Sequence, residues 1–387
     1  MMRIYFDNNA STKLDPEVQA VMADALGVFG NPSSIHTEGR RARRAVEEAR
    51  DEVAKLIGAR SGEVIFTSGG TEANAMALFG AAAGAGSRIV TSAVEHPSVR
   101  APLAEISRRG VQVELIAPDP DGGLDPERFE REIRPGTALV SVMAANNEFG
   151  ALYPVAKVAR LARAAGALFH TDAVQAAGRM HVDVNAWGAD LAAISAHKLH
   201  GPKGAGALYV RRGVTLTPLT PGGGQEKKLR GGTENTVGLV GFGAAARLAR
   251  VRGVAEAGSI GVLRDRLEGA VLAATPGARV LGGRGPRLPN TSAILFPGVA
   301  GEALAIRLDL EGVAVSVGSA CSSGTVHASP TLLALGLSPA EALSVVRFSL
   351  SRHSTGEEVD RVAALVPSIV AEARALSTAP LAPAPPG

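Results

Sequence analysis

The sequence predicts an α/β protein built on a mostly parallel sheet of seven strands, with a smaller α+β unit at its C-terminal end. Between residues 60 and 210, short runs rich in Val, Ile and Leu alternate with amphipathic, Ala-rich stretches. This alternation is typical of βαβ units around a buried parallel sheet. After the Gly-rich stretch at 221–224 and the helical pattern that follows it, longer helical segments replace the alternation. A length of 387 residues also exceeds what one hydrophobic core usually serves.

The predicted elements of the large unit follow from these patterns in chain order. The apolar runs predict strands at 64–67, 88–93, 111–116, 138–143, 167–170, 191–195 and 206–210. The amphipathic stretches predict helices at 71–83, 98–109, 126–133 and 155–165.

The C-terminal unit has a different order of elements. We expect helices at 261–274, 302–311 and 356–376 and strands at 291–296 and 345–350. The expected division is therefore a large domain at 15–255 and a small domain formed by 1–14 and 256–376. The Ala- and Pro-rich tail at 377–387 is expected to be disordered.

Composition excludes several classes of protein. The chain has one cysteine, Cys321, whereas disulfide scaffolds and thiol-built zinc or iron–sulfur sites need at least two, so no metal site is predicted. The 40 basic and 37 acidic residues nearly balance, and no basic cluster lies beside aromatic residues, so nucleic acid is a poor candidate partner. No apolar stretch resembles a signal peptide or a membrane span, which predicts a cytoplasmic protein.

Lys198 is the first candidate for chemistry. It stands in the motif Ser-Ala-His-Lys at 195–198, between a predicted buried strand and a Gly/Pro loop. Ligands of open α/β sheets gather at the carboxyl ends of the strands. A lysine that is partly desolvated there, beside other cations, has a lowered pKa and can form a Schiff base. The alternative is an ordinary solvated lysine on a loop.

Asp172 and Gln175 follow the next strand end in the same way. An acid at this place could pair with a protonated pyridine nitrogen, as pyridoxal phosphate requires, and Gln175 could reach the ring's phenolic oxygen. A helix N-cap and a surface amide are the alternatives. The segment Thr-Ser-Gly-Gly-Thr-Glu at 67–72 links a strand to a helix and could bind a phosphate monoester, although a simple Gly-rich turn is equally consistent with it. It matches neither the ATP-binding P-loop nor the dinucleotide fingerprint.

Four further residues lie in suggestive contexts. His96, after a strand, could stack on a planar cofactor and move protons; Asn147 lies after another strand. Both could also be purely structural. Cys321 lies in a run of small residues with little capacity to bury apolar area, which favours a mobile, reactive thiol. Arg347 interrupts an apolar strand and suits a substrate carboxylate, with an inward ion pair as its alternative.

Together these segments resemble the cysteine desulfurases of the NifS/IscS branch, within the class V aminotransferases that use pyridoxal 5'-phosphate. The similarity runs from Tyr-Phe-Asp-Asn-Asn-Ala-Ser-Thr at 5–12, through Gly-Asn-Pro-Ser-Ser-Ile-His at 30–36 and Gly-Ser-Ala-Cys-Ser-Ser-Gly at 318–324, to Arg-Phe-Ser-Leu at 347–350. It covers nearly the whole chain and implies the fold of type I pyridoxal phosphate enzymes.

The resemblance implies a role for each candidate residue. Lys198 would bind the cofactor covalently, Asp172 and Gln175 would tune its ring, and His96 would stack on it. The phosphate would be held by Gly70, Thr71, Ser195 and His197. Thr233 would reach the phosphate of a neighbouring subunit, which implies a homodimer.

The resemblance also implies the reaction. Asn147 and Arg347 would anchor the carboxylate of L-cysteine, and Cys321 would take its sulfur as a persulfide, leaving L-alanine. The sulfur would then pass to an acceptor, such as an iron–sulfur scaffold protein. Within the same family, the alternative is a selenocysteine lyase or an aminotransferase. Outside the family, the alternative is a sulfur carrier that binds no cofactor and is therefore colourless.

Two positions depart from the family pattern. Lys227 and Lys228 stand where Arg-Gly is usual, in the segment before Thr233 that is expected to face the dimer partner. Ala75 stands where a second asparagine is common, directly after Asn74.

Overall fold

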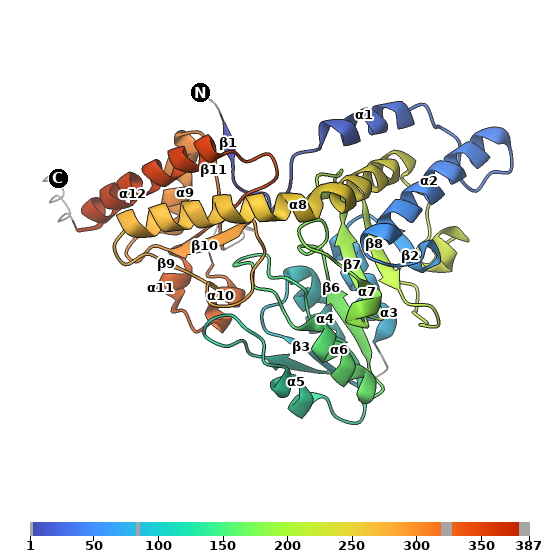
Figure 1. Ribbon diagram of the computed structural model, residues 1–387. Coiled ribbons are helices and arrows are strands. Elements are labelled where there is room, and N and C mark those ends of the chain that lie inside the picture. The colour runs from blue at the N-terminus through green and yellow to red at the C-terminus, as the bar shows by residue number, and fades with distance from the viewer. Residues whose placement is uncertain (1–2, 83–85, 319–326, 379–387) are drawn as a thin grey trace, which may run out of the picture.

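The computed structural model describes residues 3–82, 86–318 and 327–378. Its centre is a seven-stranded sheet, which confirms the predicted α/β class with a mostly parallel sheet (Figure 1). The strands are β2 (Val64–Thr67), β3 (Arg88–Ser92), β4 (Gln112–Ile116), β5 (Thr137–Ser141), β6 (Leu168–Asp172), β7 (Leu191–Ser195) and β8 (Gly206–Val210). Their order is β2-β8-β7-β6-β5-β3-β4, and only β8 runs antiparallel to its neighbours.

This strand order has a direct consequence for the position of a site. Because β8 is antiparallel to both β2 and β7, β2 again runs parallel to the rest of the sheet. The carboxyl ends of β2, β3, β5, β6 and β7 therefore meet at one edge, where open α/β sheets bind their ligands.

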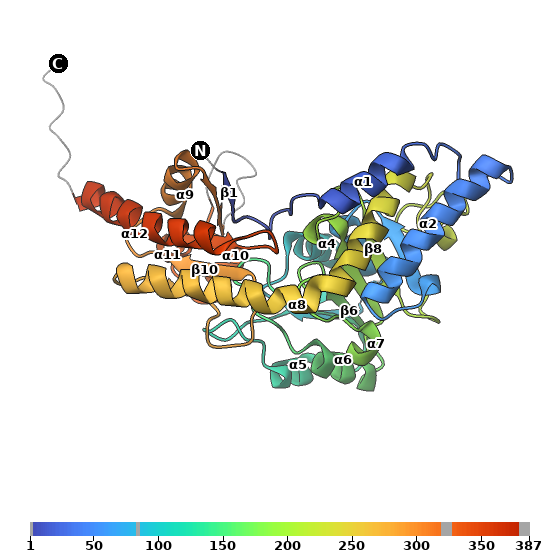
Figure 2. The same cartoon turned by 45° about the horizontal axis from the view of Figure 1, so that its top comes forward.

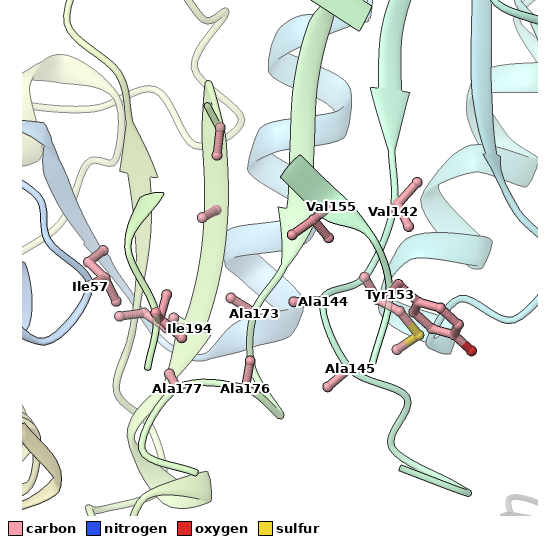
Figure 3. Close-up of a cluster of buried hydrophobic side chains, with 14 of the residues drawn as sticks. Ile57, Val142, Ala144, Ala145, Tyr153, Val155, Ala173, Ala176, Ala177 and Ile194 are labelled. Atoms are coloured by element: carbon pink, nitrogen blue, oxygen red, sulfur yellow. The ribbon is translucent and has the colours of Figure 1, made fainter. Parts of the chain in front are cut away.

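Helices cover both faces of the sheet. The helices of this unit are α1 (Pro16–Ala25), α2 (Thr37–Leu56), α3 (Gly70–Ala81), α4 (Pro97–Arg108), α5 (Pro126–Glu132), α6 (Val155–Ala164) and α7 (Val184–Trp187), with short 3₁₀ turns η1 (Ser61–Glu63), η2 (Ala196–Lys198) and η3 (Gln225–Lys228). Buried side chains of α3 and α4 pack on one face, and those of α2, α6 and α8 (Thr236–Ala274) pack on the other. Figure 3 shows part of the core on the α2 and α6 face, where the small side chain of Ala173 lies near Ile194 of β7.

Local signals explain where several helices begin. The side chains of Asp15 and Asp125 accept hydrogen bonds from backbone N–H groups in the first turns of α1 and α5, at 2.9 Å in both cases. Each is followed by a proline at the first helical position, where the missing N–H has no partner to lose. Helices α1 and α2 were not predicted from the sequence, although these signals precede α1.

The helix predicted at 261–274 is only the end of a much longer one. The observed helix, α8 (Thr236–Ala274), has 39 residues and contains several glycines that would weaken it in isolation. Its N-terminal part packs against α1 and α2, and its C-terminal part packs against α12 (Gly356–Thr378), as Figures 1 and 2 show. Local propensity alone would break this segment at its glycines. Packing against α1, α2 and α12 therefore keeps the helix continuous.

The C-terminal unit has its own sheet and its own core. Strands β9 (Arg279–Val280), β10 (Thr291–Leu295), β12 (Ser316–Val317) and β13 (Val345–Ser349) form an antiparallel sheet in the order β12-β13-β10-β9. The helices there are α9 (Gly301–Leu310), α10 (Pro330–Ala334), α11 (Pro339–Ala342) and α12. The predicted strands at 291–296 and 345–350 and helices at 302–311 and 356–376 are thus present.

The N-terminal segment joins this second core. Strand β1 (Ile4–Tyr5) pairs in parallel with β11 (Val313–Ala314), and the side chains of Ile4 and Phe6 are fully buried in the C-terminal core. Of the tail predicted at 377–387, the part from residue 379 on lies outside the described residues. Within the described ranges, no helix has the length and apolar character needed to cross a membrane.

Candidate active site

A cavity of about 250 Å³ lies at the carboxyl edge of the large sheet. Most of the residues predicted from the sequence line it: Gly70, Thr71, His96, Asn147, Asp172, Gln175, Ser195, His197 and Lys198. The remaining lining residues are Ser98, Met143 and Val174. Residues spread over more than 120 positions of the chain meet here because they follow parallel strands that end at the same edge.

Lys198 is the end of the 3₁₀ turn η2, which follows β7 directly. Its Nζ donates to the carbonyl oxygens of Asn9 and Ala10, at 2.5 and 2.8 Å. Burial, together with the nearby cations Arg179 and Arg347, lowers the pKa of Lys198 to about 7. An amine with this pKa is partly neutral at physiological pH, as a Schiff-base lysine needs to be.

Asp172 ends strand β6 and is almost fully buried. Its Oδ1 accepts from the backbone N–H of Val174 at 2.9 Å, and its Oδ2 accepts from Asn74 Nδ2 at 2.7 Å. These two donors hold the carboxylate in one orientation. Asp172 is not a helix cap, which was the structural alternative considered for it.

Two polar contacts hold the side chain of Gln175, one with Arg179 and one with the N-terminal segment. Its Oε1 accepts a hydrogen bond from Arg179, and its Nε2 donates to the carbonyl oxygen of Asn9 at 3.0 Å. Because the amide oxygen is bound to Arg179, the second hydrogen of Nε2 is the group that remains for an acceptor in the cavity. The surface-amide alternative is wrong, since Gln175 is buried.

The N-terminus of α3 forms a third wall of the cavity. Gly70 begins the helix, Thr71 follows, and their first-turn N–H groups have no partners within the helix. Ser195 adds a fully buried Oγ without a hydrogen-bond partner among the described residues. The pKa of His197 is lowered to about 4 by burial and by neighbouring cations, so this imidazole is a neutral donor at pH 7.

His96 caps helix α4 and lines the cavity. Its Nδ1 accepts from the backbone N–H of Ser98 at 3.1 Å and lies 2.7 Å from Ser98 Oγ. Burial is the largest influence on His96 and lowers its pKa, so the ring is neutral near pH 7.

Arg347 and Asn147 lie next to each other at the junction with the C-terminal unit. Arg347 Nη1 donates to the carbonyl oxygen of Asn147 at 2.9 Å, and Nη2 pairs with Asp7 Oδ1 at 2.9 Å. The inward ion pair considered as an alternative for Arg347 is therefore present. Its Nε is buried and has no partner within the described part of the chain.

Of the predicted residues that the structure describes, Arg347 and Thr233 do not line the cavity. Thr233 lies on an exposed loop. Cys321 falls in 319–326, outside the described residues.

Several residues at the site had no role in the sequence analysis. Arg179 contacts Gln175 and lowers the pKa of Lys198, Asn9 accepts from Lys198, and Ser98 and Asn74 contact His96 and Asp172. Arg179 follows Gln175 by four residues, a spacing at which side chains can meet, but nothing in the sequence distinguishes it from the other arginines.

The family model described as aminotransferase class-V matches residues 4–362. A protein of Cereibacter sphaeroides named cysteine desulfurase is 48% identical over 382 residues, which are 97% of this chain and 98% of that protein.

The chain belongs to the cysteine desulfurase family.

Two solved structures similar to this chain extend that finding. A NifS-like protein superposes with a TM-score of 0.89 at 35% identity, covering 96% of this chain and 100% of the other. A structure described as SspA in complex with cysteine has a TM-score of 0.79 at 31% identity, covering 92% of this chain and 100% of the other. The resemblance drawn from the sequence motifs is thereby confirmed.

One of the departures from the cysteine desulfurase pattern coincides with unusual backbone geometry. Glu226, Lys227 and Lys228 all have positive φ, at 42°, 58° and 67°, a region that favours glycine. The buried carboxylate of Glu226 forms two 2.7 Å hydrogen bonds with Arg50 and accepts from the N–H of Phe66 at 2.8 Å. These contacts maintain a left-handed turn at Lys228, where glycine is usual in the family.

Proposed function

We propose that this protein is a pyridoxal 5'-phosphate-dependent cysteine desulfurase. It would convert L-cysteine to L-alanine and place the sulfur on Cys321 as a persulfide. The observation that carries the proposal is Lys198, whose amine has a pKa of about 7 and stands at a cavity together with Asp172 and the N-terminus of α3. The names of the relatives and the cysteine-bound structural neighbour support the same substrate.

The residues present fit this cofactor. The buried, unpartnered Oγ of Ser195 and the open first turn of α3 are donors suited to a phosphate group. Gly70 leaves room at this wall of the cavity, because a Cβ at this position would lie 2.7 Å from the Val174 side chain. The Asp172 carboxylate suits a protonated ring nitrogen, and the free Gln175 hydrogen suits a phenolic oxygen.

The chain's own residues would bind, orient and exchange protons. When bound, the cofactor supplies an electron sink that allows the Cβ–sulfur bond of cysteine to break. Lys198 would hold the cofactor and, once displaced by the substrate amine, would carry a proton as a base with a pKa near neutrality. His96, neutral and capped on Nδ1, would stack on the ring and offer a second proton-carrying group at Nε2.

Arg347 and Asn147 would anchor the substrate carboxylate. The support for this role is their mutual contact at 2.9 Å, the place of Asn147 in the cavity wall, and the unpartnered Nε of Arg347. The ion pair with Asp7 would hold the guanidinium plane in a constant orientation.

The sulfur transfer would depend on Cys321. Its thiolate attacks the substrate sulfur, an S–S bond forms, and the electron pair of the broken C–S bond remains on the carbon that becomes alanine after protonation. With one cysteine per chain, no second thiol of the same chain can resolve the persulfide. The sulfur would therefore pass to an external thiol, and we propose a scaffold protein of iron–sulfur cluster assembly as the acceptor.

The assembly and location form part of the same proposal. A homodimer would bring Thr233 of one subunit to the phosphate of the other, which agrees with its exposed place away from its own cavity. The C-terminal core contains Ile4 and Phe6 and no residue from 15–255, which supports a small domain of 1–14 and 256–376 beside a large domain at 15–255. A cytoplasmic location would keep Cys321 reduced.

Measuring the products from L-cysteine tests this function. With dithiothreitol as reductant, the purified protein should release alanine and sulfide in equal amounts and show the yellow colour of a lysine-bound cofactor. Cys321→Ala should abolish sulfide and alanine release, because no other thiol of the chain can take the sulfur.

The absorption spectrum is the control for this variant. Cys321→Ala should keep the visible band, which shows that the cofactor site is intact, whereas Lys198→Ala should lose the borohydride-trapped adduct. If Cys321→Ala releases alanine and sulfide at the wild-type rate, the proposed desulfurase mechanism is wrong.

A further inference from the structure

Behind the cavity, a chain of hydrogen bonds connects Asp172 to His96 through two residues with no assigned role. Asn74 lies one turn into α3, and Ser98 lies in the first turn of α4. Asn74 Nδ2 is 2.7 Å from Asp172 Oδ2 and 2.8 Å from Ser98 Oγ, and Ser98 Oγ is 2.7 Å from His96 Nδ1. Asn74 is fully buried, and Ser98 is 7% exposed.

The direction of these bonds follows from the chemistry of their ends. An ionised carboxylate only accepts hydrogen bonds, so the amide atom beside Asp172 must be the nitrogen of Asn74. Its two hydrogens then go to the Asp172 carboxylate and to Ser98 Oγ. Asn74 Oδ1 is left without a partner among the described residues, which shows that the two acceptors determine the orientation of the amide.

The hydrogen bonds around Ser98 also determine which ring nitrogen of His96 carries the proton. Because Ser98 Oγ accepts from Asn74, its own hydrogen can be donated to His96 Nδ1. The backbone N–H of Ser98, which can only donate, also points to Nδ1 at 3.1 Å. A nitrogen that accepts twice carries no proton, so the neutral ring holds its hydrogen on Nε2.

The charged groups around His96 do not reverse the lowering of its pKa. Asp172 of β6 raises the pKa of His96, while Lys198 of η2 and Arg347 of β13 lower it, and burial, the largest influence, also lowers it. Neutral His96 is therefore the form that the surrounding elements favour.

We propose that Asn74 and Ser98 are positioning residues that connect the Asp172 carboxylate to His96 and hold His96 in its Nε2–H form. This inference rests on the proposed function, in which Asp172 meets the cofactor ring nitrogen and His96 stacks on the ring. Asn74 would thereby join two groups, from β6 and from the loop before α4, that would both hold the cofactor ring.

Nitrogen-15 NMR of histidine side chains tests the proposal in the cofactor-free protein. The signal of His96 is identified by its absence in His96→Asn. The wild type should show an unprotonated Nδ1 and a protonated Nε2. Asn74→Asp keeps the shape but replaces the donor with an acceptor for the Ser98 hydroxyl, so His96 Nδ1 should shift toward the protonated position. Ser98→Ala should shift it in the same direction.

The holoenzyme gives a second, independent readout. Asn74→Asp places another carboxyl group beside Asp172, so the pH midpoint of the cofactor's visible band should move. Activity should fall by roughly 10- to 100-fold, as is found when groups that orient a reactive centre are removed. Ser98→Ala should lower kcat/KM by roughly fivefold, the effect of one hydrogen bond.

Ser141→Ala is the matched control. Ser141 Oγ lies 2.8 Å from His170 Nδ1, so the variant removes the same kind of bond from a buried histidine that does not line the cavity. It should leave the His96 signal and the visible band unchanged.

The proposal is overturned if wild-type His96 carries its proton on Nδ1. It is also overturned if Asn74→Asp and Ser98→Ala change thermal stability alone, as a merely structural role would require. A wild-type protein that releases no alanine from cysteine would instead refute the proposed function, and the NMR result on the cofactor-free protein would still stand.

Discussion

Lys198 shows how single residues in this site obtain their chemistry from their neighbours. Its amine is partly buried, donates to two backbone carbonyls, and stands near the guanidinium groups of Arg179 and Arg347. Burial and like charges both disfavour the protonated amine, whereas Asp172 and Asp7 favour it. The pKa of about 7 is the balance between these influences.

Replacing Arg179 should shift this balance. Arg179→Met removes a cation near Lys198, so the pKa of Lys198 should rise, by roughly one unit, and less neutral amine remains at pH 7. Covalent uptake of pyridoxal phosphate by the cofactor-free protein should then be about fivefold slower at pH 7, with its pH midpoint moved upward. The visible absorbance of the adduct measures both.

Arg179→Lys serves as the matched control because it keeps the charge. It should retain most of the uptake rate and the lower midpoint. An unchanged midpoint in Arg179→Met would show that Arg179 does not set the Lys198 pKa.

At the scale of elements, the site depends on the close contact between the β2–α3 turn and strand β8. A Cβ on Gly206, the first residue of β8, would lie 2.5 Å from the Cα of Gly69. Only glycine permits this approach, because the obstacle is backbone and has no side chain that could rotate away. The contact places the first turn of α3 beside Ser195, which pairs with Gly206 across β7 and β8.

Gly206→Ala should therefore affect both stability and cofactor binding. We expect a loss of about 1–3 kcal/mol in the free energy of unfolding, the usual range for overpacking, and weaker binding of pyridoxal phosphate because the Gly69–Gly70 turn must move. Urea unfolding and a fluorescence titration with the cofactor measure the two effects.

Gly62→Ala is the control, since a Cβ there meets no atom within 4 Å. It should match the wild type in both assays. Wild-type cofactor affinity in Gly206→Ala would contradict the view that this contact positions the turn.

At the scale of the whole molecule, the N-terminal segment and α8 connect the two cores. Ile4 and Phe6 are buried in the C-terminal core, and a few residues later Asn9 accepts from Lys198 at the cavity of the large sheet. Asp7 pairs with Arg347 of the C-terminal sheet. The relative position of the two sheets thus bears directly on the site.

Buried histidines make the stability of the whole molecule depend on pH. Burial lowers the pKa of His170 to about 3, whereas its ordinary value is 6.5. Between these values the unfolded chain binds a proton that the folded protein does not, so stability is lost as pH falls from 6.5 toward 3. His170 should contribute a slope of up to about 1.4 kcal/mol per pH unit in this window.

Comparing the wild type with His170→Asn isolates this contribution. Glu95 acts in the opposite direction, because its pKa is raised to about 8 by burial, but it is present in both proteins. Urea unfolding at pH 5 and pH 6 should show a shallower pH dependence in the variant. Equal slopes would mean that His170 is not a neutral, buried group.

Much of the sheet and most of the cavity follow from local patterns. All seven strands of the large sheet lie within two or three residues of their predicted ranges, because strands buried on both faces appear in the sequence as short apolar runs. Polar residues directly after such runs, such as Asp172 and Lys198, must meet at the carboxyl edge of a parallel sheet. The helices α1 and α2 and the continuity of α8 were not predicted. In α2 the buried residues Ala42, Val46, Ala49 and Val53 recur at helical spacing, so this helix was open to prediction from the sequence, whereas the glycines of α8 conceal its continuity until tertiary packing is included.

The sequence by itself determined the family, the fold class and the residues at the ends of the strands, because periodicity and motifs are local properties of the chain. Only the tertiary structure decided which groups surround those residues. The cations that lower the pKa of Lys198, the ion pair of Asp7 with Arg347, and the chain from Asp172 through Asn74 and Ser98 to His96 join distant segments. Hydrogen bonds and burial depend on distances in space, which no local pattern of residues specifies.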